Sequence, residues 1–324
     1  MSWATCYIAP TKTLWQGRAD LPDSSCFFQI IQMLNLHASI PPQDKPAFAC
    51  IGFSCDEGVT RNLGRAGAAE GPKAIREVLA KLPVQRQHIV CYDAGDIACV
   101  DGNLEQAQSA LAESVNLLLQ HGIIPVVLGG GHELAWGHYQ GIAKKYPHEN
   151  LGIVNFDAHF DMRPLLPENK GSSGTPFLQI AHAHEAAKRR FDYNCIGIQR
   201  AGNIPLLFAT AEAYHARMLL ADDVHQSRSE QIFDFIRRVI EQNQIIYLSL
   251  CLDVFASPYA PGVSAPQSFG LTPWQVIPLL RQLAESGKIV SYDIAELSPK
   301  YDRDHRTAKL AANFIFEIIH HHQF

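Results

Sequence analysis

Residues 155–163 read NFDAHFDMR, and within this run Asp157, His159 and Asp161 are spaced by two. Where a strand continues through such a run, alternate side chains face the same side. Where the strand opens into a loop, the three side chains can still converge on one point. Carboxylate oxygens combined with an imidazole nitrogen suit a divalent transition ion such as Mn²⁺. The run therefore predicts a metal site.

Three other polar clusters follow apolar runs, at residues 129–133, 251–255 and 293–297. In the first, His132 follows three glycines, which let backbone segments approach closely. The second places Cys251 and Asp253 two positions apart, on the same side of a strand, and the third contains Glu296. Ligand sites in open parallel sheets form outside the carboxyl ends of the strands. We therefore expect all four clusters to share one site, with His132 and Asp253 as further metal ligands.

The elements that must position these clusters are short apolar runs with the composition of buried strands, at 48–53, 88–93, 123–129, 151–157, 193–198, 245–253 and 288–294. They are apolar throughout, which is typical of a parallel sheet covered on both faces. Amphipathic stretches long enough for crossover helices lie at 103–120, 132–146, 226–242 and 272–286. The alternation predicts the α/β class, as a three-layer α/β/α sandwich with a mainly parallel sheet.

The chain has 324 residues, a length that one large α/β domain can reach. No repeat or long linker marks a boundary, so we expect a single domain over residues 1–324, with residues 1–45 as an N-terminal extension of uncertain structure. Residues 54–72 are polar and glycine-rich, which predicts a long functional loop before a helix that begins near Pro72.

The composition, 47% hydrophobic and 18% charged, is that of an ordinary globular protein. No apolar run approaches the roughly 20 residues that span a bilayer, and the first residues lack a secretory pattern. We therefore expect a cytoplasmic protein with no membrane partner. The eight cysteines lack CxxC spacing and are interpreted as reduced thiols. A net charge of −5 without a basic tract argues against a nucleic-acid partner and favours a small-molecule substrate.

Simpler explanations exist for single members of the clusters. An aspartate at a strand end is often only the N-cap of a helix, and Glu296 could equally be a solvated loop residue. Glu133 directly follows His132 and is interpreted as the start of a helix. Several other histidines have no candidate ligand at a regular spacing, and we assign them no functional role. They are His138, His182, His184 and residues 320–322.

Taken in this order, the four clusters resemble the ureohydrolase superfamily of arginase, agmatinase and formimidoylglutamase, over roughly residues 48–318. The superfamily's motifs are a Gly-Gly-x-His turn, an Asp-Ala-His-x-Asp run, a strand with two aspartates before a Pro-Gly loop, and a late glutamate, here Glu296. The resemblance implies a homo-oligomer with two Mn²⁺ ions per chain, which activate water for attack on a guanidino or formimino carbon. It implies catalytic roles for Asp161 and for Glu296, which would hold the cationic C–N group of the substrate.

Within the superfamily, the segments 55–72, 159–163 and 172–177 look most like formimidoylglutamase. This resemblance implies hydrolysis of N-formimidoyl-L-glutamate to L-glutamate and formamide in histidine degradation. The substrate carries two carboxylates, which the planar fork of arginine suits, and Arg61, Arg65 and Arg163 are the candidates. Each of the three could equally be a surface charge. Ser173 stands where arginase-like members carry a proton-shuttling histidine, so it is grouped with the substrate-binding residues and argues against an arginase.

Cys251 is the main departure from the superfamily pattern. The superfamily strand carries Asp-x-Asp, with the second aspartate eight residues before the proline of the Pro-Gly loop, and counting back from Pro261 gives Asp253. Cys251 then takes the place of the aspartate that bridges both ions. The resemblance assigns one ion to His132, Asp157 and Asp161, and the other to Asp157, His159 and Asp253. Alternatively, Cys251 is an ordinary buried cysteine and one metal site is weakened or empty. A related guanidino-acid hydrolase of agmatinase type and a catalytically silent relative that binds a small acid therefore stay open.

Overall fold

A single central sheet organises the molecule. The computed structural model describes residues 5–86, 88–226 and 229–324. Its sheet has ten strands within these residues, in the order β1-β4-β3-β5-β10-β9-β6-β7-β8, with β2 also pairing with β4. The strands are β1 (Tyr7–Ile8), β2 (Gln32–Met33), β3 (Ala47–Ser54), β4 (Val90–Ala98), β5 (Ile123–Gly129), β6 (Leu151–Phe156), β7 (Asp192–Ile198), β8 (Arg217–Leu220), β9 (Ile245–Cys251) and β10 (Ile289–Ala295). Every pairing is parallel except that of β1 with β4.

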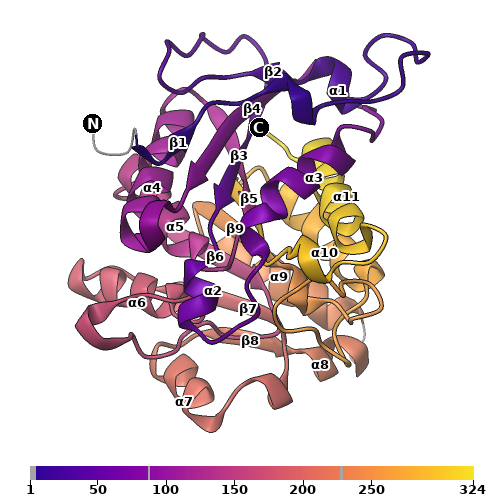
Figure 1. Ribbon diagram of the computed structural model, residues 1–324. Helices are drawn as coiled ribbons and strands as arrows, with labels where there is room; N and C mark the ends of the chain where they lie inside the picture. The colour runs from indigo at the N-terminus through magenta and orange to yellow at the C-terminus, as the bar shows by residue number, and fades with distance from the viewer. Residues whose placement is uncertain (1–4, 87, 227–228) are drawn as a thin grey trace.

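Helices cover both faces of the sheet (Figure 1). They are α1 (Phe27–Ile30), α2 (Glu57–Arg61), α3 (Gly71–Leu79), α4 (Leu104–Gln120), α5 (Leu134–Lys145), α6 (Pro176–Ala186), α7 (Pro205–Ala213), α8 (Ala221–Gln226), α9 (Ser229–Gln242), α10 (Pro273–Ala284) and α11 (Arg306–His321). Helices α3, α8, α9, α10 and α11 pack into one apolar core, and α4, α5, α6 and α7 into the other. The predicted three-layer α/β sandwich with a mainly parallel sheet is confirmed. None of the described helices combines the length and apolar character needed to cross a membrane.

The seven apolar runs all form strands, and their boundaries lie within two residues of the predicted ones except at the end of β4. Strand β4 continues past the predicted end at residue 93 to Ala98, because its aspartates are paired inside the protein. Arg76 reaches Asp93 at 2.9 Å and Asp96 at 2.7 Å. Strand β9 ends at Cys251, and Asp253 lies in the 3-10 turn that follows. The four predicted helices form as α4, α5, α9 and α10, although residues 227–228 of the stretch 226–242 lie outside the described residues.

The prediction that residues 54–72 form one long loop is wrong. This segment contains helix α2 and a 3-10 turn at Ala68–Glu70 before α3 begins at Gly71. Asp56 organises the stretch between them, because its side chain accepts a hydrogen bond from the backbone N–H of Gly67 at 2.6 Å. The segment therefore has its own structure and follows directly from the carboxyl end of β3.

The described part of the N-terminal segment, residues 5–45, adds strands to the sheet edge. Strand β1 pairs with the second half of β4 and β2 with its first half. The indole N–H of Trp15 donates to Asp93 at 2.7 Å, and the backbone N–H of Phe27 donates to the carbonyl of Leu82 at 3.1 Å. This segment closes an edge of the sheet far from the polar clusters.

Candidate metal centre and substrate pocket

Four adjacent strands position the polar clusters. In the sheet, β5, β10, β9 and β6 are consecutive neighbours, although they are far apart in the sequence. His132 follows β5, Glu296 follows β10, Cys251 ends β9, and Asp157 follows β6 directly. The four clusters therefore meet at one sheet edge, as expected for parallel strands.

Gly130 allows the turn after β5 to lie against the end of β3. A Cβ atom at this position would lie 2.4 Å from the carbonyl oxygen of Phe53 and 2.5 Å from that of Cys55, too close for any side chain. The same turn binds β10, because the backbone N–H of Glu296 donates to the carbonyl of Gly130 at 2.8 Å. In return, the backbone N–H of His132 donates to Oε1 of Glu296 at 2.8 Å. These bonds fix His132 and Glu296 relative to each other.

One group of donor atoms surrounds His132. Its Nδ1 lies 2.9 Å from Oδ2 of Asp157 and 3.0 Å from Oδ2 of Asp161. The ligand atoms of His132, Asp157 and Cys251 also lie within 4.8 Å of one another. His132 follows β5, Asp157 and Asp161 follow β6, and the Cys251 thiol lies at the end of β9. Together they offer nitrogen, oxygen and sulfur to one point, a set suited to a divalent transition metal.

A second group shares Asp157. The Nδ1 atom of His159 lies 3.1 Å from Oδ2 of Asp253 and 3.5 Å from Oδ1 of Asp157. The three side chains form a second possible ligand set within 4.8 Å. The DAHFD run thus leaves the strand after Phe156, and its three polar side chains converge from a loop instead of from a continued strand.

The donor chemistry of the first group fits a cation. Nδ1 of His132 is buried and has no hydrogen-bond partner among the described residues, although two carboxylate oxygens lie within 3.0 Å. Its other nitrogen, Nε2, lies 2.8 Å from Oγ of Ser249. A ring nitrogen that faces two oxygens without hydrogen-bond geometry is placed as a metal ligand would be, since a ligating imidazole presents a bare nitrogen.

The site holds more acidic side chains than histidines. Asp157, Asp253 and Glu296 are buried, and within the described residues no lysine or arginine forms an ion pair with them. Burial, followed by the charge of Asp157, raises the pKa of Asp161 to about 6. Burial, followed by the nearby Glu133 and Asp253, raises the pKa of Glu296. Burial and the charge of Asp157 raise the pKa of the Cys251 thiol. Burial opposes protonation of His132 and His159, but the carboxylates that face them raise the pKa of both. Two histidines cannot neutralise Asp157, Asp161, Asp253 and Glu296 together, and buried carboxylates without a counter-charge are costly, so divalent cations would neutralise the remainder.

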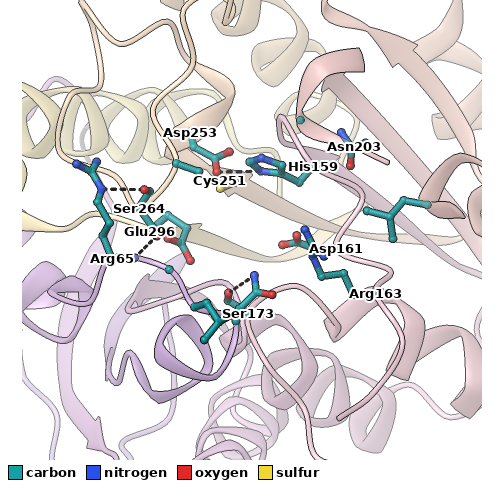
Figure 2. A pocket seen from close by; sticks show the side chains of 16 residues that line it. Arg65, His159, Asp161, Arg163, Ser173, Asn203, Cys251, Asp253, Ser264 and Glu296 are labelled. Atoms are coloured by element: carbon teal, nitrogen blue, oxygen red, sulfur yellow. Dashed lines mark hydrogen bonds and ion pairs between the residues drawn. The ribbon is translucent and has the colours of Figure 1, made fainter. Parts of the chain in front are cut away.

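A pocket of about 310 Å³ opens above these groups. Figure 2 shows His159, Asp253 and Cys251 on one side of it and Asp161 on another, with Arg65 and Arg163 at opposite margins. The Arg163 side chain is exposed and forms no hydrogen bond or ion pair with the described residues. Its backbone N–H donates to the carbonyl of Gly174 at 2.8 Å. The pocket therefore presents a guanidinium group that no carboxylate of the described chain neutralises.

Arg65 also lines the pocket, but it is held by the protein. Its Nε donates to the carbonyl of Ser264 at 2.9 Å, its Nη2 donates to the carbonyl of Val263 at 2.5 Å, and its guanidinium lies 4.2 Å from the centroid of the Tyr301 ring. None of these partners is a carboxylate. The Arg65 charge therefore remains available beside the pocket, in a fixed position.

Arg61 does not line the pocket. Its guanidinium lies 3.0 Å from Glu57 and 2.6 Å from Glu105, and it also donates to the carbonyls of Gly102 and Gly171. These partners neutralise it and hold α2 against the start of α4. The substrate-binding role expected for Arg61 therefore has no support in its placement.

Ser173 does line the pocket, and its hydroxyl accepts a hydrogen bond from Nδ2 of Asn62 at 3.2 Å. Asn62, Asn203 and Ser264 also line the pocket, and none of them stood out in the sequence. Asn203 orients the DAHFD loop, because it accepts from the N–H of Phe160 at 3.1 Å and donates to the carbonyl of Ala158 at 2.9 Å. No spacing rule identifies such residues, since their partners come from other segments.

Comparisons with known proteins point to one family. A model of the arginase family matches residues 46–321. The formimidoylglutamase of Legionella pneumophila is 45% identical over 314 residues, which cover 97% of this chain and 97% of that protein. The formimidoylglutamase of Geobacillus thermodenitrificans is 42% identical over 320 residues, again with 97% of each chain covered. The crystal structure of Trypanosoma cruzi formiminoglutamase with Mn²⁺ superposes with a TM-score of 0.76 at 27% identity, over 85% of this chain and 92% of that chain.

Proposed function

The chain belongs to the arginase family, and from this premise we propose that it hydrolyses N-formimidoyl-L-glutamate to L-glutamate and formamide, a step of histidine degradation. The resemblance to the ureohydrolase superfamily is confirmed by the family match and by the relatives. One observation supports this choice of substrate. Arg163 has no carboxylate partner among the described residues, and it lines a pocket whose floor carries the proposed metal ligands. A formimino group could lie over the metal ligands, while a carboxylate of the substrate pairs with the Arg163 guanidinium.

Manganese is the expected cofactor, with two ions per chain. His132, Asp157 and Asp161 would hold one ion and Asp157, His159 and Asp253 the other, with Cys251 between them. Bound Mn²⁺ lowers the pKa of a coordinated water enough to supply a nucleophile near neutral pH. The protein's own contribution is to hold the donors in place from several strands, so that no ligand has to be reorganised when the substrate arrives.

Glu296 and Asp161 are the proposed catalytic residues. Glu296 lines the pocket, and its Oε1 is fixed by the backbone N–H of His132 at 2.8 Å. A carboxylate in this position can hold the cationic C–N group of the substrate over the donor set. Asp161 lines the pocket beside His132 and would orient the group being attacked. Both residues would also shield the reacting carbon from bulk water.

Arg163 and Arg65 would bind the two carboxylates of the substrate from opposite margins of the pocket, and Ser173 would add a hydroxyl beside Arg163. Agmatine carries an amine instead of carboxylates, so both guanidinium groups would repel it. The homo-oligomeric state, the cytoplasmic location and the single domain over residues 1–324 stay predictions. Cys251 favours one alternative, a silent relative that binds a small acid without turnover.

A substrate panel and metal analysis test the proposal together. The purified protein loaded with Mn²⁺ should release formamide from formimidoylglutamate and produce little urea from arginine or agmatine. Comparable turnover of agmatine and formimidoylglutamate would contradict the choice of substrate. Tight binding of formimidoylglutamate without release of formamide, in protein with full metal occupancy, would instead support the silent relative.

A further inference from the structure

A buried polar chain lies behind His132, away from the pocket. It consists of Ser249 and Tyr247 on β9, Asp293 and Ser291 on β10, and His138 on α5, all of them 0% exposed. None of the five lines the pocket described above. His138 is one of the histidines that had no assignable role in the sequence. A fully buried set of polar groups is costly unless every member is satisfied.

Hydrogen-bond accounting along this chain determines which nitrogen of His132 carries the proton. The Ser249 hydroxyl donates to Oδ1 of Asp293 at 2.6 Å, because the carboxylate can only accept. The remaining lone pairs of Ser249 then face Nε2 of His132 at 2.8 Å, so Nε2 must be the donor. In the neutral imidazole that metal binding requires, the other nitrogen is then bare. That nitrogen is Nδ1, which faces Asp157 and Asp161.

Asp293 is held in this orientation by the rest of the chain. Its second oxygen, Oδ2, accepts from the Tyr247 hydroxyl and lies 2.8 Å from Nδ1 of His138. The other nitrogen of His138 lies 2.6 Å from Oγ of Ser291, whose hydroxyl donates to the carbonyl of Pro125 at 3.2 Å. His138 also packs edge-on against the Tyr247 ring, with centroids 4.6 Å apart. The carboxylate therefore cannot rotate away from Ser249 without breaking several buried bonds.

Among the described residues, this polar chain reaches one of the two donor groups and not the other. His159 belongs to the second group and contacts Asp157 and Asp253, with its side chain 22% exposed and no link to Asp293. A network that only stabilised the core would not need to contact His132, which faces the proposed metal ligands. Partners of this kind fix the tautomer and the ring orientation of ligating histidines.

We infer that Asp293 and His138 are positioning residues of the metal centre, which hold His132 with its proton on Nε2 and its bare Nδ1 aimed at the ion it shares with Asp157 and Asp161. The inference rests on the proposed metal centre. It goes beyond that centre, because it assigns to two buried residues outside the pocket an effect on the binding of only one of the two ions. Loss of this polar chain should weaken the binding of that ion and leave the binding of the ion at His159 unchanged.

Two variants break the chain in different ways. Ser249→Ala removes the link between Asp293 and His132 and changes only one hydroxyl. The double variant Asp293→Leu, His138→Phe removes the carboxylate and the imidazole together, so that neither stays buried without the other. Ser114→Ala is the matched control, because Ser114 is also 0% exposed and its hydroxyl donates only to the carbonyl of Ala110 within α4.

The measurement is Mn²⁺ titration of chelator-treated protein by calorimetry, with His132→Ala as the reference that identifies the ion held by His132. In the two chain variants that ion should bind about 10–100-fold more weakly, while the other ion and the Ser114→Ala protein should match the wild type. Thermal unfolding in chelator checks that each variant folds.

Equal Mn²⁺ affinity in folded wild type, Ser249→Ala and the double variant would overturn the inference. Equal weakening of both ions would also overturn it, because that outcome indicates a general structural effect. A wild-type protein that takes up no Mn²⁺ overturns it together with the proposed metal centre. Selective weakening in protein that does not cleave formimidoylglutamate would leave this inference standing and refute only the proposed substrate.

Discussion

Replacement of Arg163 tests the proposed recognition of substrate carboxylates most directly. The side chain is exposed in the pocket without a carboxylate partner, while its backbone is held by Gly174. A Cβ atom at Gly174 would lie 2.7 Å from Cδ of Arg163, so the arginine stem already packs closely against this glycine. This contact restricts the stem of the side chain, so less side-chain entropy remains to be lost when a carboxylate binds.

The expected magnitude follows from the exposure of Arg163. Removing one partner of a buried charge pair costs about 2–5 kcal/mol, and a hydrogen bond to a charged group contributes about 1.5–3 kcal/mol. Because Arg163 is exposed, we take the low end, about 2 kcal/mol, which corresponds to about a 30-fold loss of kcat/KM. Arg163→Lys should recover part of this loss, since the charge remains but the planar fork is absent.

The assay compares kcat/KM for three substrates: formimidoylglutamate, formimidoyl-4-aminobutyrate without the α-carboxylate, and formimidoyl-2-aminobutyrate without the side-chain carboxylate. If Arg163 binds one carboxylate, Arg163→Ala should cost about 30-fold on the full substrate and almost nothing on the substrate that lacks that carboxylate. Mn²⁺ content should equal that of the wild type. A uniform loss on all three substrates, or a wild-type kcat/KM on the full substrate, would refute the reasoning.

Three further predictions concern the metal centre and the fold. Cys251→Asp should raise Mn²⁺ occupancy toward two per chain, because a thiolate prefers softer ions; equally tight binding of two ions before and after the change, measured by metal titration, would show that Cys251 is inert. Gly130→Ala should lower the free energy of unfolding by about 1–3 kcal/mol, as overpacking does, because the new Cβ meets the carbonyls of Phe53 and Cys55; an unchanged denaturation midpoint would contradict the close approach. Burial lowers the pKa of His322 to about 4 from 6.5. The unfolded chain therefore binds the proton first, and stability should fall by about 3 kcal/mol as the pH drops from 6.5 to 4, whereas urea denaturation of His322→Gln should show a smaller fall.

The sequence predicted the central strands well because they are buried on both faces and apolar throughout. It was less informative at the edges of the sheet. Strand β8 has four residues and begins with Arg217, whose charge is neutralised by Asp192 at 2.7 Å. Strand β4 runs through Asp93 and Asp96, which pair with Arg76, while the indole N–H of Trp15 also donates to Asp93. Both depend on contacts between distant segments, which no local pattern contains.

The same distinction holds within the candidate site. Asp157, His159 and Asp161 could be grouped from their spacing, and the structure brings them together with His132, Cys251 and Asp253. Arg61 could not be separated from Arg65 and Arg163, because its partner Glu105 lies 44 residues away. Asn62 and Asn203 had no signal at all, since each is defined by what it contacts in the folded chain.

The strand order has a consequence for how the protein is made. Strands β5 and β6 are close in the sequence, but β10 and β9 lie between them in the sheet. A nascent chain that has emerged only through α8 carries His132, Asp157, His159 and Asp161, yet the gap between their strands is empty. Cys251, Asp253 and Glu296 arrive with the last two strands, which must insert into the middle of the sheet. Such long-range pairing is slow, so the metal centre should be completed only after synthesis ends, and a ribosome-bound chain that lacks β9 and β10 should not retain Mn²⁺.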